Sequence, residues 1–126
     1  MNPRYLVGEP FTYKSQFATY PNCQFVIDRY ANPDNLYLGI CMKDPETDSL
    51  EQICHCTANT HIKLPDDRIT VKNYSENEGM EEFLIKEGII EEHPYSCITS
   101  GFVIINVFKL TEKGKKLYVP LKEDEK

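Results

Sequence analysis

The residues of this sequence best suited to chemistry are cysteines and histidines, and their densest group is Cys54-His55-Cys56. Alternate side chains of a strand share one face, so the two sulfurs would lie together with His55 opposite. His61 would add a third ligand to a zinc site. Structural zinc sites usually carry two Cys-x2-4-Cys or His-x3-5-His pairs, and this chain does not carry two such pairs. The alternative, in which Cys54 and Cys56 are small core residues of a strand, is favoured.

A second candidate pair is His93 and Cys97, which lie in a polar stretch just before Ser100-Gly101. A thiol nucleophile needs a neighbouring base that removes its proton, and a histidine supplies one. The same two side chains are also candidates to complete a zinc site with Cys54 and Cys56. The alternative is a surface histidine without a catalytic role, and loop position alone favours that alternative.

Carboxylates are the third group, and they are concentrated along one expected helix, including Glu78, Glu81 and Glu82. Such a face would recognise a basic partner or imitate the charge of nucleic acid. The alternative is a solvated helix face on which the first carboxylates complement the helix dipole.

Ser100-Gly101 forms the last candidate, because glycine at a strand entrance permits a bulge or a close backbone approach. Ser100 can bond exposed N–H groups, so this corner would hold a ligand. The alternative, which we favour, is that the corner only docks Phe102 against Phe83 in the core.

One helix and about five strands are predicted to position these groups. The helix covers about residues 76–87, with Ser75 and Glu78 as a capping box, Asn77 as a rival N-cap and Gly88 as the stop signal. Its apolar stripe needs a sheet to cover. Alternating or continuous apolar runs predict the strands, at residues 23–30, 36–42, 50–57, 68–74 and 102–110.

This order, β-β-β-β-α-β with short links, predicts an α+β fold with a mainly antiparallel sheet and the helix packed on one face. With 126 residues the chain is long enough for one domain with its own core. We expect that domain to cover residues 1–121, with a charged flexible tail at 122–126. The N-terminal segment at 1–22 is expected to be irregular or, as the alternative, to form one short edge strand around residues 11–13.

Composition restricts the partners. The net charge of −6 repels phosphate on average, so nucleic acid is an unexpected partner and another protein an expected one. No apolar run reaches the ~20 residues of a membrane span, and the first residues lack the apolar centre of a signal peptide. An odd number of cysteines, five, indicates reduced thiols. We expect a cytoplasmic protein without a cofactor.

Residues 36–110 carry several short motifs in a recognisable order. These are Thr57-Ala-Asn59, Asn73-Tyr74, a Phe-Leu-x-x-x-Gly-Ile element within Glu82 to Ile89, and Ser100-Gly-Phe102. They resemble a small bacterial family known only as a domain of unknown function, found in gut bacteria and their mobile elements. The chain departs from that family at Ile104-Ile-Asn106, where a Tyr-Pro pair is usual, and at Val71 to Ser75. The resemblance implies a small α+β domain and no activity.

The leading functional hypothesis is therefore a non-enzymatic accessory domain that binds another protein through the acidic helix face or a sheet edge. The alternatives are a small Cys/His enzyme or metal-binding protein, and an acidic mimic that inhibits a nucleic-acid-binding protein. The oligomeric state does not follow from the sequence.

Overall fold

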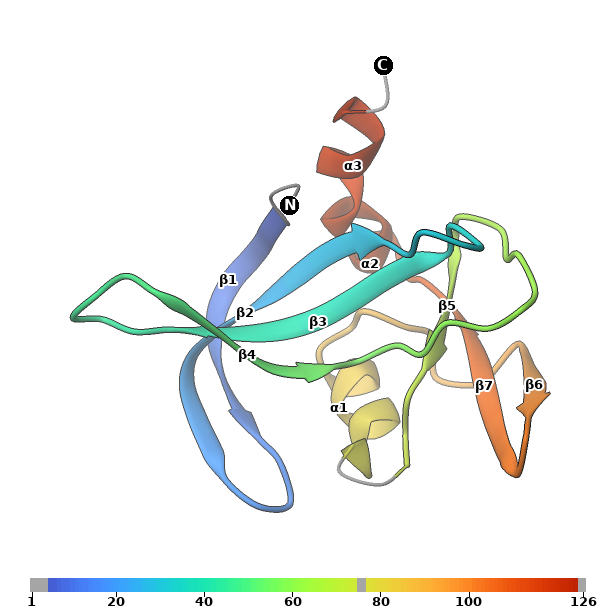
Figure 1. The fold of residues 1–126 in the computed structure, drawn as a ribbon, viewed down its shortest axis with the longest axis horizontal. Helices are drawn as coiled ribbons and strands as arrows, with labels where there is room; N and C mark the ends of the chain where they lie inside the picture. The colour runs from blue at the N-terminus through green and yellow to red at the C-terminus, as the bar shows by residue number, and fades with distance from the viewer. Residues whose placement is uncertain (1–4, 75–76, 125–126) are drawn as a thin grey trace.

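The computed structural model describes residues 5–74 and 77–124, with the backbone alone described for 122–124. Within these ranges the chain forms an α+β fold with seven strands and three short helices. The strands build two antiparallel sheets, one of four strands in the order β1-β2-β3-β4 and one of three in the order β5-β7-β6 (Figure 1). The predicted class and antiparallel pairing are confirmed, whereas the predicted sheet of about five strands is wrong.

The four-stranded sheet consists of three successive hairpins, in which each strand pairs with the next. Its strands are β1 (Tyr5–Lys14), β2 (Thr19–Arg29), β3 (Leu36–Lys43) and β4 (Leu50–His55). The prediction of an irregular segment at 1–22 is wrong for residues 5–14 and 19–22, while residues 1–4 lie outside the described part. Gly8 and Pro10, which suggested irregular structure, lie on an edge strand, and the register between β1 and β2 shifts between Val7 and Phe11. Glycine and proline are tolerated at such bulged edges.

The three-stranded sheet consists of β5 (Arg68–Val71), β6 (Ser96–Ser100) and β7 (Val103–Lys109). Strand β6 falls in a stretch that the sequence predicts as loop. It pairs with β7 from Ser96 to Ser100, and Gly101 and Phe102 form a two-residue hairpin loop. Gly101 has a φ of +60°, a conformation that glycine adopts at low cost.

A short segment after β4 joins the two sheets. The N–H of Cys56 donates to the carbonyl of Leu38 on β3 (2.8 Å), and the carbonyl of Cys56 accepts from the N–H of Lys72 just after β5 (2.8 Å). Thr57 also forms an isolated bridge with Val71. The backbone of this segment therefore continues the hydrogen bonding from one sheet to the other.

Helix α1 (Met80–Lys86) is shorter than the predicted 76–87. Its N-cap is Gly79, which has a φ of +94°. Glycine has no side chain that could bond the first turn of the helix. Instead, Asn73 Oδ1 accepts from the N–H of Glu81 (2.8 Å). The predicted capping box involves Ser75, which lies outside the described residues, and the rival Asn77 donates its amide to the carbonyl of His55. Tertiary contacts thus replace the local cap.

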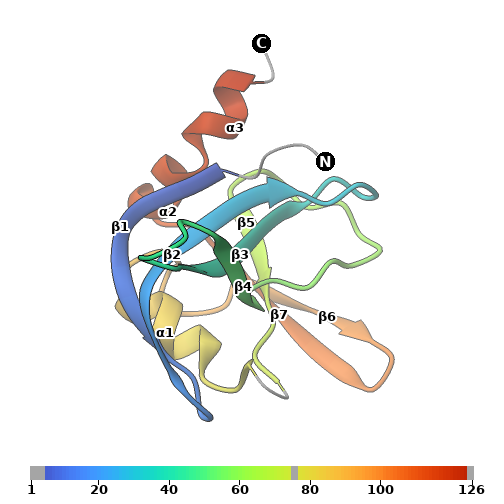
Figure 2. The same cartoon turned by 60° about the vertical axis from the view of Figure 1, so that its left-hand side comes forward.

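The core lies between the sheets and α1. Met80 and Leu84 are buried, and the ring of Phe83 lies 5.1 to 6.2 Å from the rings of three aromatic residues of β1 and β2, namely Phe11, Tyr13 and Phe25. Figures 1 and 2 show α1 in the opening between the curved four-stranded sheet and the three-stranded sheet. The expectation that Phe102 docks against Phe83 is wrong, because Phe102 is fully exposed at the hairpin loop.

Two further helices follow β7, α2 (Glu112–Leu117) and α3 (Val119–Asp124). Thr111 caps α2 by accepting the N–H of Gly114 (3.0 Å). Between them, the buried Tyr118 donates its hydroxyl to the carbonyl of Tyr37 on β3 (2.9 Å). The predicted flexible tail is helical through Asp124, and residues 125–126 lie outside the described part. None of the helices in that part has the length and apolar character needed to cross a membrane.

Candidate functional site

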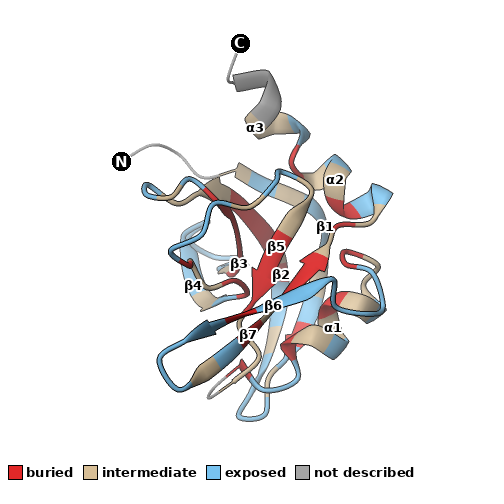
Figure 3. Cartoon of the chain, turned by 90° about the vertical axis from the view of Figure 1, so that its right-hand side faces the viewer, coloured by how far each residue is buried: buried red, intermediate tan, exposed pale blue. Residues whose placement is uncertain are grey.

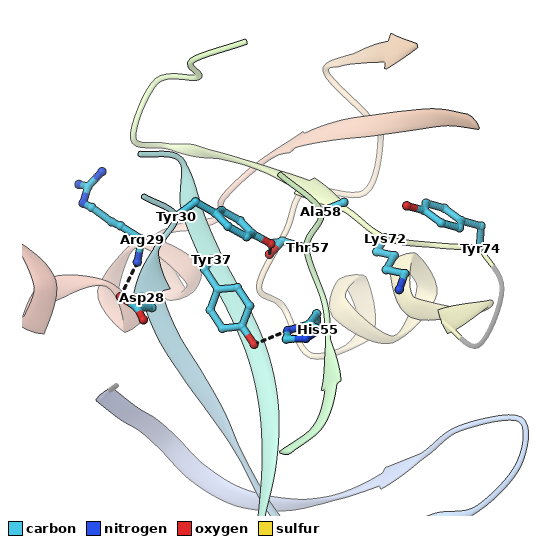
Figure 4. A pocket seen from close by; sticks show the side chains of 9 residues that line it. All are labelled: Asp28, Arg29, Tyr30, Tyr37, His55, Thr57, Ala58, Lys72 and Tyr74. Atoms are coloured by element: carbon cyan, nitrogen blue, oxygen red, sulfur yellow. Dashed lines mark hydrogen bonds between the residues drawn. The ribbon is translucent and has the colours of Figure 1, made fainter. Parts of the chain in front are cut away.

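The outer face of the four-stranded sheet carries a groove with a volume of about 310 Å³. One side is formed by residues at the paired ends of β2, β3 and β4, and the other by the segment that follows β5 (Figure 4). It is lined by Asp28, Arg29, Tyr30, Tyr37, His55, Thr57, Ala58, Lys72 and Tyr74. Because β-strand side chains alternate, these β2 to β4 residues are the outward counterparts of the core positions.

The Tyr37 ring lies over the backbone of β3, because the next residue on the same face of this strand is Gly39. A Cβ atom at Gly39 would lie 2.2 Å from the Tyr37 hydroxyl oxygen, so the phenol lies directly over this glycine. The cross-strand partner of Gly39 on β4 is His55. The missing side chain at position 39 therefore allows the ring of Tyr37, which is 5% exposed, to reach the imidazole.

Three polar groups form a closed hydrogen-bond network at this point. Gln52 Nε2 donates to the Tyr37 hydroxyl (2.7 Å), which lies 2.7 Å from His55 Nδ1, and Gln52 Nε2 lies 2.9 Å from the same nitrogen. Because the Gln52 amide donates to the Tyr37 hydroxyl, this hydroxyl keeps its own proton for a bond to His55 Nδ1. In the tautomer in which Nδ1 accepts that bond, the imidazole proton is on Nε2.

Hydrogen bonds also hold Tyr30 and Thr57, two further residues of the groove, in place. The hydroxyls of Tyr30 and Thr57 lie 3.0 Å apart, and Thr57 Oγ1 also accepts from the N–H of Leu38 (3.2 Å). The rings of Tyr30 and Tyr37 meet edge to face at 5.5 Å, as do those of Tyr37 and His55. Together they form a row of three rings whose polar atoms are fixed by bonds to the sheet.

The opposite wall carries a cation and a further aromatic ring. Lys72 Nζ lies 5.7 Å from the centre of the Tyr74 ring. At the β2 end, Arg29 makes two bonds of 3.2 Å to the Asp66 carboxylate, and this lowers the pKa of Asp66. The Asp28 carboxylate accepts the N–H of Arg29 (2.7 Å). Arg29 is thus paired with Asp66, and Lys72 lines the opposite side of the groove.

The second candidate surface is the hairpin β6–β7, whose outer end is exposed (Figure 3). Phe102 is fully exposed, and Ile104 is 67% exposed, whereas Ile98 and Ile105 on the other face of the hairpin are buried. Strand β6 is the last strand of its sheet. Within the described residues the hairpin therefore offers a strand edge that pairs with no further strand, next to two large apolar side chains.

The predicted interaction residues lie at two places, the turn of this hairpin and the region of helix α1. Ser100 and Gly101 lie at the turn of this hairpin and are exposed. Glu78 and Glu82 are exposed near α1, whereas Glu81 is partly buried and accepts from the side-chain amide of Asn106 on β7 (3.0 Å). The Glu81 carboxylate is therefore held beside β7.

The side chains of Cys54 and Cys56 interact with each other, but the described histidines do not join them in a metal-binding group. Cys56 is buried and Cys54 partly buried, while His61 is exposed in the loop after β4. Among the described residues, no three Cys, His, Asp or Glu side chains are grouped so as to hold a metal ion. Burial raises the pKa of the Cys56 thiol well above its ordinary value, which keeps it protonated.

Cys97 and His93 are likewise not joined by a hydrogen bond in the described part of the chain. Cys97 lies exposed on β6 opposite Asn106, and His93 is exposed in the loop before that strand. The thiol–imidazole contact that nucleophilic catalysis requires is therefore not formed.

The chain matches no family model, no curated protein and no solved structure, so the resemblance drawn from its motifs stays a prediction. Function must be argued from the geometry of the two surfaces. Sequence reasoning missed the groove, although the alternation Tyr37-x-Gly39 on a strand was a usable signal. A glycine beside a large ring on the outer face indicates that the ring lies over the backbone.

Proposed function

We propose that this protein is a cytoplasmic, non-enzymatic interaction domain that adds an extended segment of a partner protein to the edge strand β6. Peptides that extend a sheet gain main-chain hydrogen bonds from the open edge and specificity from alternate side chains. The observation that carries the proposal is the combination of this open edge with the exposed Phe102 and Ile104.

The edges of the two sheets differ in a way that supports this choice. Proteins usually protect edge strands with charges, proline or bulges, because an open edge is a template for pairing. Strand β1 carries Glu9, Pro10 and a register shift, and β4 carries Glu51. Strand β6 has the sequence Ser-Cys-Ile-Thr-Ser, without charge or proline. Of these three edges it is the one least protected against pairing.

Charge determines the expected partner. The carboxylate of Glu81 lies beside the cross-strand pair Cys97 and Asn106, and Glu82 is exposed on the same helix. A Lys or Arg side chain on the added strand would face these carboxylates, and apolar side chains would cover Ile104. The partner is thus an extended segment that alternates apolar with polar residues and carries at least one basic residue.

The proposal is tested by selecting binders from a library of random nonapeptides and measuring their affinity by fluorescence anisotropy. The selected peptides should alternate apolar and polar residues, include a basic one and protect the β6 amides from hydrogen exchange. Ile104→Ser should raise their Kd about tenfold, because burial of a large aliphatic side chain contributes about 1.5–3 kcal/mol.

The matched control is Phe17→Ser, since Phe17 is 76% exposed on the loop of the other hairpin, β1–β2. This change should leave the affinity within about twofold. Binders that protect amides of other strands, or that bind Ile104→Ser as well as the wild type, would refute the proposal.

A further inference from the structure

We propose that the groove on the outer face of the four-stranded sheet is a binding site for a small organic oxyanion with a flat aromatic ring, such as a nucleoside monophosphate. This site is separate from the strand edge proposed above. Its volume of about 310 Å³ lies at the lower end of the range of small-molecule pockets and suits a ligand of this size.

The walls indicate the flat ring. The row formed by Tyr30, Tyr37 and His55 lies on one side of the groove, and Tyr74 lies on the other (Figure 4). Aromatic side chains favour offset stacked or edge-to-face contacts with a planar ligand, and such contacts do not depend on the identity of the ring.

The polar groups indicate the anion. Lys72 contributes an ammonium group, and in the tautomer in which Nδ1 accepts from Tyr37, His55 contributes an Nε2–H donor. Of the three tyrosines that line the groove, Tyr30 and Tyr74 also carry hydroxyls that are capable of donating. The lining also contains one carboxylate, that of Asp28, which accepts the backbone N–H of Arg29 (2.7 Å). A lining dominated by donors binds oxygen anions, and charge-assisted bonds from Lys are stronger than neutral ones.

The side chains are held before any ligand binds. Tyr37 is buried to 95% over Gly39, with bonds to Gln52 and His55, and Tyr30 is bonded to Thr57. A core position alone would be filled as well by phenylalanine, so the Tyr37 hydroxyl serves to orient the imidazole. Preorganised groups lose little conformational entropy on binding, which is typical of small-molecule sites.

The experiment is a titration of the full-length ¹⁵N-labelled protein with adenosine and uridine monophosphates, phenyl phosphate, adenosine and inorganic phosphate, followed by NMR. The ring-bearing phosphates should shift the amides of Thr57, Lys72 and Tyr74, with Kd values below about 1 mM for the nucleotides. Adenosine and inorganic phosphate, which each lack one half of the ligand, should bind at least about tenfold more weakly.

Variants separate the two halves of the site. Lys72→Gln should raise the Kd about tenfold or more through loss of the charged donor, and Tyr74→Leu should raise it through loss of the ring. The matched control Lys43→Gln, an exposed lysine at the end of β3, should change the Kd less than twofold. If none of the ring-bearing phosphates shifts these amides at 5 mM, or if Lys72→Gln binds like the control, the proposal is wrong.

Discussion

The hairpin β6–β7 and the outer groove differ in how their side chains are held. In the groove, Tyr37 is buried and bonded to two neighbours, whereas Phe102 and Ile104 on the hairpin extend into solvent. Fixed polar groups suit a small ligand, because their geometry is set before binding. Exposed apolar groups beside an open strand edge suit a partner chain that supplies the missing contacts. One small domain thus carries two surfaces built on different principles.

The largest expected effect is a difference in the free energy of unfolding between variants on the two faces of the hairpin. Ile105→Ala should lower the free energy of unfolding by about 2–4 kcal/mol, because Ile105 is 3% exposed and its truncation leaves a cavity. The neighbouring Ile104→Ala should change it by less than about 0.5 kcal/mol. Urea unfolding of both variants is the measurement. Equal losses would mean that the outer face is also packed, and the contrast with the groove would fail.

A second test compares the glycines of the two regions. Gly39→Ala should cost about 1–3 kcal/mol, because the new Cβ collides with the Tyr37 hydroxyl. Gly101→Ala should cost about 1 kcal/mol from its φ of +60° alone, since its Cβ would meet open space. Thermal unfolding gives both values. In a Tyr37→Ala background the Gly39→Ala cost should nearly vanish, and a cost that persists there would contradict the proposed ring position.

The third test uses pH. It compares Cys56, which is buried in the segment that joins the two sheets, with Cys97, which is exposed on the hairpin. Burial raises the pKa of the Cys56 thiol above its ordinary value, so the folded state keeps this proton longer than the unfolded chain. Its stabilising contribution is complete below about pH 9 and is lost as the pH rises further, by at most about 1.4 kcal/mol per pH unit.

Urea unfolding at pH 8, 9, 10 and 11 should therefore show a smaller alkaline loss for Cys56→Ala than for the wild type. The exposed Cys97 on the hairpin provides the control, and Cys97→Ala should follow the wild-type curve. A steep loss shared equally by Cys56→Ala would assign the effect to other buried groups, of which Tyr118 is one with a raised pKa.

The smallest expected effect concerns the ion pair beside the groove. The Arg29 guanidinium lowers the pKa of Asp66, so the pair stabilises the fold above the ordinary carboxyl range and its contribution is lost as the pH falls. Asp66 is half exposed, so Asp66→Asn should cost only about 0.2–0.5 kcal/mol at pH 7 and nothing at pH 2. A larger loss at pH 7 would show that Asp66 positions the groove wall.

The sequence was sufficient for the elements with strong hydrophobic patterns. The runs at residues 23–30, 36–42, 50–57 and 68–74 correspond to β2, β3, β4 and β5. Strand β6 was not predictable in this way, because Ile98 is its one large apolar residue and the other four are small. The backbone bonds of Cys56 that join the two sheets leave no trace in side-chain periodicity.

The two surfaces were unequally predictable. Ser100 and Gly101 were singled out from the glycine alone, and they lie at the turn of the hairpin. The contact of Tyr37 with His55 requires the register of β3 and β4, which shifts by a bulge between Ile40 and Cys41. A bulge of one residue reverses which side chains share a face, so the sequence spacing alone gives the wrong partners.

The backbone of Cys56 and Thr57 belongs to both sheets at once, through bonds to Leu38 on one side and to Lys72 and Val71 on the other. Neither half of the molecule can detach without exposing these groups, so the chain should melt as one cooperative unit. Calorimetric and van't Hoff enthalpies should then agree.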